Sequence, residues 1–166
     1  NRGPAIEATR VAAEALRLAV PGITLRTTIM TGFPGETEAR FERLRADLKR
    51  MQFDHLGAFA FSPEEGTKAA KLNGRPPRAV AEMRERIVMS DAEEMWKLRS
   101  KRLVGTVHEA LVVAPGVARL ASQAPDVDGV TYIVASKKNE VSPEVGAFVK
   151  LRITAVDGFD LEGERA

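Results

Sequence analysis

The sequence predicts an α/β region followed by a small all-β barrel of the OB-like kind. Up to Ser100, long helical patterns alternate with short apolar strands, whereas after Val104 short strands are separated by turns. The charge also changes, because residues 1–101 carry 18 Lys/Arg and 14 Asp/Glu, while residues 102–166 carry 7 and 9. We therefore expect two domains, residues 1–101 and 102–166.

Composition narrows the function classes. The 166 residues include no cysteine and only two histidines, so a disulfide, a thiolate-held cluster or a histidine-rich metal site within them is not expected. No apolar run approaches the roughly 18–20 residues that span a bilayer, and no signal peptide pattern is present. We expect a cytoplasmic protein without a membrane partner. Since Asn1 is not methionine and no strand precedes the first helical pattern, we also expect a piece of a longer chain.

The first region reads as helix, strand, helix, strand, helix. Ala, Glu, Arg and Leu favour a helix from Pro4 to Leu18, and the β-branched run Ile23–Thr31 is typical of a buried strand. Thr37 is a plausible N-cap for the helix that follows. A second strand, His55–Phe61, and a final helix over residues 76–101 complete the pattern, which predicts parallel strands.

Two turns rich in glycine and proline follow these strands, Gly32–Glu36 and Ser62–Thr67. In parallel sheets the carboxyl ends of neighbouring strands meet at one edge, where ligands bind. Glycine allows close approach of a backbone to a flat ligand, and a helix N-terminus attracts a carboxylate. Arg26, expected midway along its strand, could pair with a carboxylate. The alternative is a plain strand-to-helix turn with structural glycines.

The final helix is expected to bury one apolar arc. Its members are Val80, Met83, Ile87, Val88, Met95 and Leu98. Trp96 falls outside this arc, so it either contacts the second region or is half exposed. The charged remainder of the helix is expected to be solvated.

Five candidate strands make up the second region. They are Thr106–Ala114, Val117–Ala124, Val130–Ala135, Phe148–Val156 and Phe159–Glu164. Asp157-Gly158 between the last two is a hairpin signal. Such antiparallel barrels bind nucleic acid or protein. The negative charge favours a basic protein partner over a phosphate backbone, although a solvated surface without a partner is the alternative.

The strings Leu25–Glu38 (LRTTIMTGFPGETE) and Phe59–Thr67 (FAFSPEEGT) carry a resemblance to a known family. They resemble a strand and turn, and the next strand and turn, of the barrel of radical-SAM methylthiotransferases. The second region is similar to the TRAM domain of that family. The resemblance implies a partial radical-SAM (TIM-like) α/β barrel followed by an OB-like TRAM barrel.

The pair Glu64-Glu65 and the string Ala124–Gly129 (APDVDG) are similar to the ribosomal-protein (RimO-type) branch of this family. Phe61 departs from the family's usual tyrosine. The larger departure is that the cysteines expected for the radical-SAM cluster and for the auxiliary cluster are absent from this chain. The resemblance therefore implies a C-terminal part of the enzyme, without catalytic residues of its own and inactive alone.

The resemblance implies transfer of a methylthio group to an aspartate of a basic small-subunit ribosomal protein. S-adenosylmethionine and two 4Fe-4S clusters would be the cofactors, and the ribosome itself could take part. The expected S-adenosylmethionine site is Arg26, Gly32, Pro34, Gly35 and Phe61. The expected substrate-facing residues are Asp126, Asp128, Asp157 and Asp160. We also expect an exposed apolar edge along Ile23–Thr31, because its barrel neighbour is absent.

Two alternatives stay open from the sequence. One is a transfer-RNA methylthiotransferase of the MiaB type, whose second region would bind RNA. The other is a non-enzymatic module that binds protein or RNA and keeps a partial barrel as a scaffold.

Overall fold

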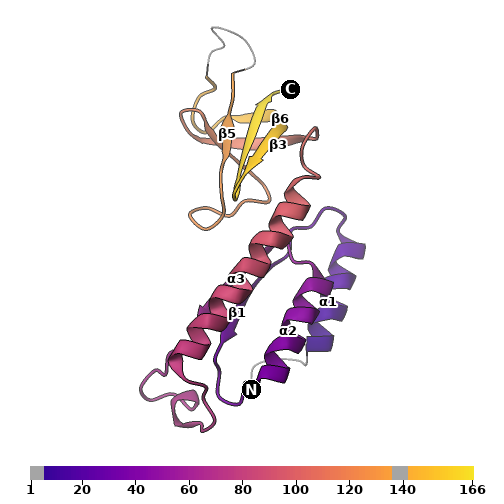
Figure 1. The fold of residues 1–166 in the computed structure, drawn as a ribbon. Coiled ribbons are helices and arrows are strands. Elements are labelled where there is room, and N and C mark those ends of the chain that lie inside the picture. The colour runs from indigo at the N-terminus through magenta and orange to yellow at the C-terminus, as the bar shows by residue number, and fades with distance from the viewer. Residues whose placement is uncertain (1–5, 136–141) are drawn as a thin grey trace. The chain divides into compact units, whose positions relative to one another are not determined.

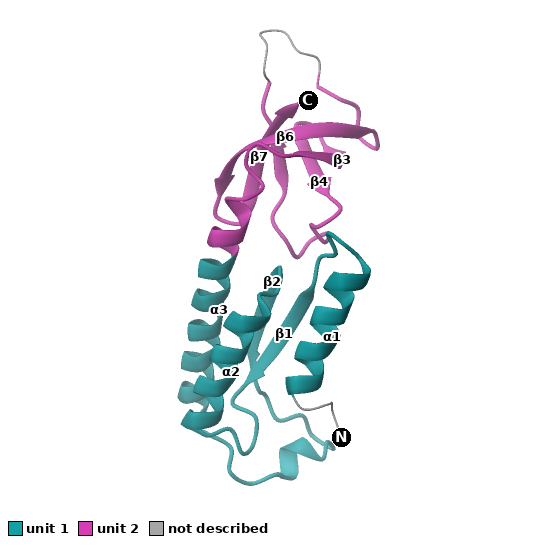
Figure 2. Ribbon diagram, turned by 90° about the vertical axis from the view of Figure 1, so that its right-hand side faces the viewer, with its two compact units in different colours: residues 1–95 teal, residues 96–166 magenta. Residues whose placement is uncertain are grey.

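The computed structural model describes residues 6–135 and 142–166, which form two compact units (Figure 2). Unit 1 comprises residues 1–95 and unit 2 residues 96–166. The division lies within the longest helix, slightly before the boundary expected after residue 101.

Unit 1 alternates helices with two parallel strands. In chain order the elements are α1 (Ile6–Ala19), β1 (Arg26–Thr31), α2 (Glu38–Met51), β2 (His55–Ala60), the 3-10 helix η1 (Ala69–Lys71) and α3 (Arg78–Ser100). Strand β1 pairs with β2 in parallel, from Arg26 opposite His55 to Thr31 opposite Ala60. Helices α1 and α2 lie side by side (Figure 1). The predicted parallel pairing is confirmed.

One face of this small sheet packs against the helices. Ile29 on β1 and Leu56 on β2 join a core that includes the buried side chains of Phe41, Leu48 and Val88. Among the described residues β1 pairs only with β2, so its other edge has no strand partner, as expected. The apolar side chains near that edge are more sheltered than expected, because they face the helices.

The ends of α2 are capped by side chains. The Thr37 hydroxyl accepts a hydrogen bond from the Arg40 backbone N–H at 3.3 Å, so the predicted N-cap is confirmed. At the other end, Arg17 of α1 donates to the carbonyl oxygens of Met51 and Gln52 at 2.7 and 2.6 Å. These bonds satisfy carbonyl groups that a helix end leaves unpaired and tie α1 to α2.

Helix α3 departs from the expected apolar arc. Met83 and Leu98 are exposed, whereas Arg84 and Asp91 are buried, so the expectation of a fully solvated charged face is wrong. The reason is that both buried charges have partners on or beside α2. Asp91 accepts from Arg45 at 2.7 and 3.1 Å, and this bond lowers the pKa of the Asp91 carboxyl despite its burial.

Unit 2 is a closed five-stranded barrel. Its strands are β3 (Val107–Ala114), β4 (Val117–Leu120), β5 (Thr131–Ile133), β6 (Phe148–Asp157) and β7 (Asp160–Arg165). Their order around the barrel is β3-β4-β5-β7-β6. The prediction of five strands in a small OB-like barrel is confirmed. It is not wholly antiparallel, because β5 and β7 pair in parallel.

The barrel core holds small and branched apolar side chains together with Trp96 from the end of α3. The buried Gln123 side chain accepts hydrogen bonds from the Leu120 backbone N–H and the Thr131 hydroxyl, both at 2.9 Å. The Trp96 indole donates to the Gly158 carbonyl oxygen at 2.8 Å and stacks on Phe159 with ring centroids 6.2 Å apart. Of the two placements expected for Trp96, contact with the second region is therefore the one observed.

Replacing Trp96 with phenylalanine should destabilise the barrel. The change removes the hydrogen bond to Gly158 and part of the aromatic stack, which should lower the free energy of unfolding by about 1–2 kcal/mol. Urea unfolding followed by far-UV circular dichroism measures this. The matched control is Leu98→Ala, whose side chain is 69% exposed, and it should change stability by less than about 0.5 kcal/mol. Equal effects of the two changes would contradict the anchoring role of Trp96.

Candidate functional site

A cavity of about 710 Å³ opens in unit 1 where the two parallel strands end and helix α3 begins. Its lining from the strand ends is Gly32, Phe59, Ala60, Phe61, Ser62 and Pro63. Its lining from the approach to α3 and from α3 itself is Arg75, Pro76, Pro77, Arg78, Ala81, Glu82 and Glu85. The volume falls within the roughly 300–1,000 Å³ that small-molecule sites occupy.

The structure brings together the two turns that the sequence placed side by side. The Phe61 N–H donates to the Thr31 carbonyl oxygen at 2.8 Å, and the rings of Phe33 and Phe61 meet edge to face at 5.3 Å. Two of the five expected S-adenosylmethionine residues, Gly32 and Phe61, line the cavity. Pro34 lies in the same turn but is not part of the lining.

Gly35, also expected in the site, ties its turn to the loop before α3. Its N–H donates to the Gly74 carbonyl oxygen at 2.9 Å, and its carbonyl oxygen accepts from Arg40 at 2.7 Å. Gly35 itself does not line the cavity. Its contribution is to the shape of the turn.

Arg26 lies away from this cavity. The expectation that it stands midway along its strand is wrong, because β1 begins at Arg26, opposite His55. Five residue steps separate it from Thr31, a distance of roughly 16 Å along a strand. A ligand contact from Arg26 stays a prediction, and the cavity does not include it.

The end of β1 is packed tightly against α3. The Thr31 hydroxyl is buried and donates to the Ala81 carbonyl oxygen at 2.9 Å. Gly32 has a φ of +75°, and a Cβ atom built on it would lie 2.2 Å from the Cβ of Ala81. Only glycine fits this position, both for its backbone conformation and for the close approach.

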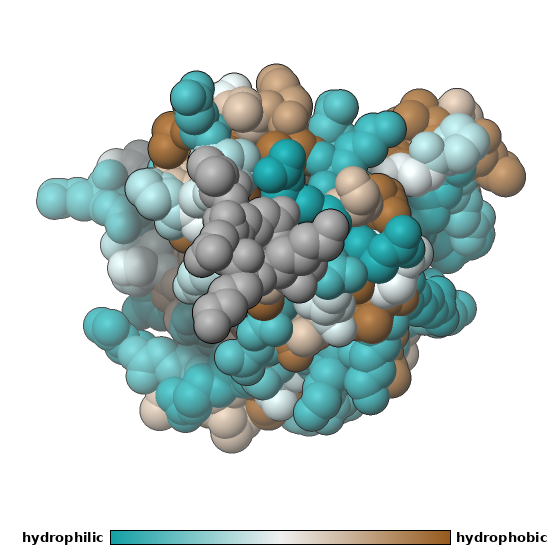
Figure 3. Space-filling model, turned by 90° about the horizontal axis from the view of Figure 1, so that it is seen from above, coloured by the Kyte–Doolittle hydropathy of each residue, from teal (hydrophilic) through white to brown (hydrophobic). Residues whose placement is uncertain are grey.

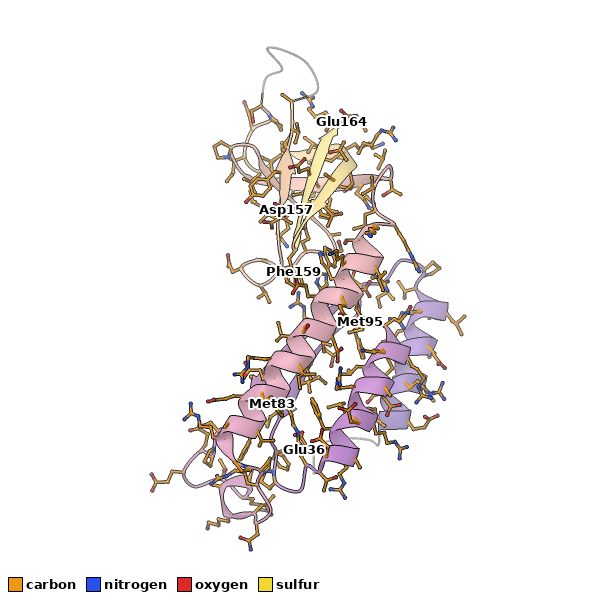
Figure 4. All side chains as sticks on the ribbon, viewed as in Figure 1. Glu36, Met83, Met95, Asp157, Phe159 and Glu164 are labelled. Carbon is orange, nitrogen blue, oxygen red and sulfur yellow. The ribbon has the colours of Figure 1, made fainter. Side chains whose placement is uncertain are left out.

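A buried ion pair holds the turn that follows. Arg84 on α3 donates to Glu36 at 2.8 Å and to Glu38 at 2.7 Å, and its guanidinium lies 5.0 Å from the ring centre of Phe41. The same Glu36 oxygen accepts from the Gly32 N–H at 2.9 Å. Figure 4 shows Glu36 beside the first turn of α2. Burial lowers the pKa of Arg84, but hydrogen bonds to both carboxylates outweigh it and raise that pKa, so the guanidinium stays charged.

The cavity joins aromatic, cationic and anionic groups. Glu85 accepts from the Ala60 N–H at 3.2 Å, and Arg78 donates to Glu82 at 2.7 Å. Aromatic rings beside charged side chains of both signs suit a ligand that has a flat ring system, an ammonium group and a carboxylate group. The residues present therefore fit the nucleoside and amino-acid parts of S-adenosylmethionine.

Sequence reasoning missed the contribution of α3 to this site. Ala81, Arg84, Val88 and Asp91 recur at spacings of three and four residues, which places them on one face of a helix. That periodicity was a usable signal, but it mixes charged with apolar residues. The predicted arc counted large apolar residues alone, so it included Val88 but left out Ala81, Arg84 and Asp91.

Of the four aspartates expected to face substrate, Asp126 and Asp128 lie in the loop between β4 and β5, whereas Asp157 ends β6 and Asp160 begins β7 across the hairpin turn. Asp128 accepts from the Ala124 N–H and Asp160 from the Val130 N–H, each at 2.7 Å, so both carboxylates hold loop backbone. Asp126 and Asp157 are exposed. A Cβ on Gly129 would lie 2.1 Å from the Phe159 carbonyl oxygen, which shows how closely the β4–β5 loop approaches the β6–β7 turn. A substrate role for these aspartates stays a prediction.

Within residues 6–135 and 142–166, no three histidine, aspartate or glutamate side chains gather where they could hold a metal ion. None of the helices in those ranges has the length and apolar character needed to cross a membrane.

Replacing Gly32 with alanine should destabilise unit 1 by several kcal/mol, because the new methyl group would overlap Ala81 in a strained backbone conformation. Gly66 is the matched control, since it also has a positive φ, +81°, but nothing lies within 4 Å of an added Cβ. Gly66→Ala should cost only about 1 kcal/mol. Thermal unfolding of both variants measures the difference, and equal costs would contradict the close packing on α3.

Replacing Arg84 with methionine should lower the free energy of unfolding by about 3 kcal/mol, because it leaves the half-buried Glu36 carboxylate without its charge partner. Arg86→Met, at an exposed position on the same helix, should change stability by less than about 0.5 kcal/mol. Urea unfolding at neutral pH compares them. A variant at position 84 as stable as the wild type would show that the ion pair does not hold the turn.

Comparison with known proteins extends over both units. Residues 101–165 match the TRAM domain family. The chain is 39% identical over 158 residues to the ribosomal protein uS12 methylthiotransferase RimO of Syntrophus aciditrophicus, covering 91% of this chain and 34% of that protein. It is 41% identical over 148 residues to the protein of the same name from Burkholderia thailandensis, covering 87% of this chain and 32% of the relative.

The chain thus spans about a third of the length of the curated relatives that it matches. The resemblance inferred from the motifs is confirmed: over most of its length this chain is similar to the RimO methylthiotransferases, and its second unit carries a TRAM domain.

Proposed function

We propose that this chain forms part of an enzyme that adds a methylthio group to an aspartate of ribosomal protein uS12. The observation that carries the proposal is the 39–41% identity to uS12 methylthiotransferases, which extends over about nine tenths of the chain. The cytoplasm is the proposed location, because the substrate is a ribosomal protein.

Unit 1 would supply one side of an S-adenosylmethionine site within a partial radical-SAM (TIM-like) barrel. The cavity at the strand ends supports this, because Phe61 offers a ring to an adenine and Gly32 leaves the backbone open to approach. Arg75 and Arg78 could hold the carboxylate of the amino-acid part. When bound, S-adenosylmethionine and the iron–sulfur clusters would supply radical hydrogen abstraction, sulfur and a methyl group.

The ligands of the two 4Fe-4S clusters would come from outside these 166 residues. Cluster irons are held by cysteine thiolates, and the chain contains no cysteine. The groups of this chain would therefore bind and orient S-adenosylmethionine and would exclude water around it. They would not hold the clusters.

Unit 2 would recognise the basic substrate. Residues 102–166, which include all five barrel strands, carry 9 Asp/Glu and 7 Lys/Arg, although Lys97, Arg99 and Lys101 at the end of α3 bring unit 2 as a whole to 10 Lys/Arg. Opposite charges across an interface steer association and select partners. A basic ribosomal protein fits this barrel better than RNA does, since RNA affinity grows with lysine and arginine contacts to phosphates. The MiaB-type alternative would need the reverse preference.

The decisive comparison is between the cysteine-bearing enzyme, carrying its clusters, and the 166-residue chain alone. We expect the former to methylthiolate uS12 in the presence of S-adenosylmethionine and a reductant, as seen by peptide mass spectrometry. The chain alone should release no 5′-deoxyadenosine, because it lacks cluster ligands. Cleavage of S-adenosylmethionine by the chain alone, or modification of a transfer RNA in place of uS12 by the enzyme, would contradict the proposal.

A further inference from the structure

One outer face of the barrel combines an aromatic ring, aliphatic side chains and carboxylates. Thr131 and Leu161 point into the barrel and are fully buried, so the residues that follow them, Tyr132 and Glu162, point outward. Tyr132 is 47% exposed and is the sole tyrosine of the chain. Val134, just past β5, is 44% exposed.

The strand register places these side chains next to one another. Tyr132 lies opposite Val117 of β4 on one side and opposite Glu162 of β7 on the other. The Val134 N–H donates to the Gly163 carbonyl oxygen at 2.9 Å, which sets Val134 beside Glu164. We define the β4–β5–β7 face as Val117, Tyr132, Val134, Glu162 and Glu164.

The carboxylates of this face are available for a cationic partner. Within the described part of the chain, neither Glu162 nor Glu164 forms an ion pair or a side-chain hydrogen bond. Arg152 lies opposite Glu164 in register, but its guanidinium donates to the Gly105 carbonyl oxygen at 3.0 Å. The guanidinium of Arg119 on β4 likewise donates to the Gln123 carbonyl oxygen at 2.9 Å.

Lysine and arginine side chains match such a surface. Their aliphatic stems can lie on an aromatic ring and on valines, while the charged heads reach carboxylates at the edge. A nucleic acid does not match, because its phosphates would meet Glu162 and Glu164. The face places two carboxylates beside Val117, Tyr132 and Val134, so a polar, charged partner is favoured over a purely apolar one. Figure 3, which views the molecule from above, likewise shows apolar and polar residues intermixed on the side that it presents.

The position of the face in the barrel indicates a binding surface. In the order β3-β4-β5-β7-β6, strands β4 and β5 are the second and third strands of an OB-type barrel. The face formed by those two strands binds oligonucleotides and oligosaccharides in OB-folds. Topology therefore selects the surface, and the side chains on it, with two carboxylates, select a cationic protein segment over a nucleic acid.

We propose that a lysine- or arginine-rich segment of the protein substrate binds across the β4–β5–β7 face, with one cationic side chain over Tyr132 and its head on Glu162. The inference builds on the proposed function, because that function supplies a basic ribosomal protein as the partner. It differs from the expectation that Asp126, Asp128, Asp157 and Asp160 face the substrate.

The test measures binding of purified uS12 to the 166-residue chain by isothermal titration calorimetry at two salt concentrations. The test variants are Tyr132→Ala and the double variant Glu162→Gln/Glu164→Gln. Tyr132→Phe is the conservative variant, since it keeps the ring. Glu109→Gln is the matched control, because Glu109 is an exposed carboxylate on β3, opposite Lys150 of β6. Circular dichroism confirms that each variant is folded.

We expect binding that weakens with salt, and a loss of at least about tenfold in affinity for Tyr132→Ala and for the double variant. Tyr132→Phe and Glu109→Gln should bind within about twofold of the wild type. Wild-type affinity of the test variants would overturn the proposal. A loss of affinity seen only in a further double variant, Asp126→Asn/Asp157→Asn, would also overturn it. Tighter binding of a transfer-RNA stem-loop than of uS12, or no binding of uS12 to the chain, would overturn it as well.

A separate assay distinguishes this failure from failure of the proposed function. If the cluster-bearing enzyme modifies uS12 while the face variants bind it normally, the surface is wrong and the function stands. If the chain binds uS12 through Tyr132 and Glu162 but the enzyme leaves uS12 unmodified, the surface stands and the function is wrong.

Discussion

The packing of the β1–α2 turn against helix α3 is the constraint on which the candidate site depends. The turn has no room to shift, because Gly32 touches Ala81 and Thr31 donates a hydrogen bond to the same residue. Arg84 then fixes the Glu36 carboxylate, which in turn holds the Gly32 N–H. Since the cavity wall is built from this turn and from the start of α3, its shape follows from these few contacts. Preorganisation of this kind lowers the cost of ordering a ligand.

In the proposed enzyme, unit 1 would bind the cofactor and unit 2 would recognise the protein substrate. Unit 1 offers a preformed, partly enclosed cavity with charges of both signs, which suits a small zwitterionic ligand. Unit 2 is a closed barrel whose core includes Trp96 and whose exposed strands offer a surface for a larger partner. A closed barrel of this size has its interior filled by side chains, so it binds on its outside. Cofactor binding and substrate recognition would therefore be built from separate parts of the chain.

Elements with a strong local signal could be predicted from the sequence. The β-branched strands, the Thr37 N-cap and the five short strands of the barrel follow from periodicity, capping and turn residues, and the structure contains them. The burial of Arg84 and Asp91 could not be read in the same way, because it depends on partners 46 to 48 residues away in the chain. The start of β1 at Arg26 depends likewise on pairing with His55. Tertiary partners, which no local pattern records, decided these features.

The cavity at the strand ends is proposed to bind S-adenosylmethionine. Hydrogen–deuterium exchange of the cluster-bearing enzyme, measured with and without S-adenosylmethionine, decides whether it does. We expect slower exchange in peptides covering residues 32–36, 60–63 and 75–85, with residues 107–165 unchanged. Unchanged exchange in the three cavity segments, together with protection elsewhere in the chain, would contradict the claim.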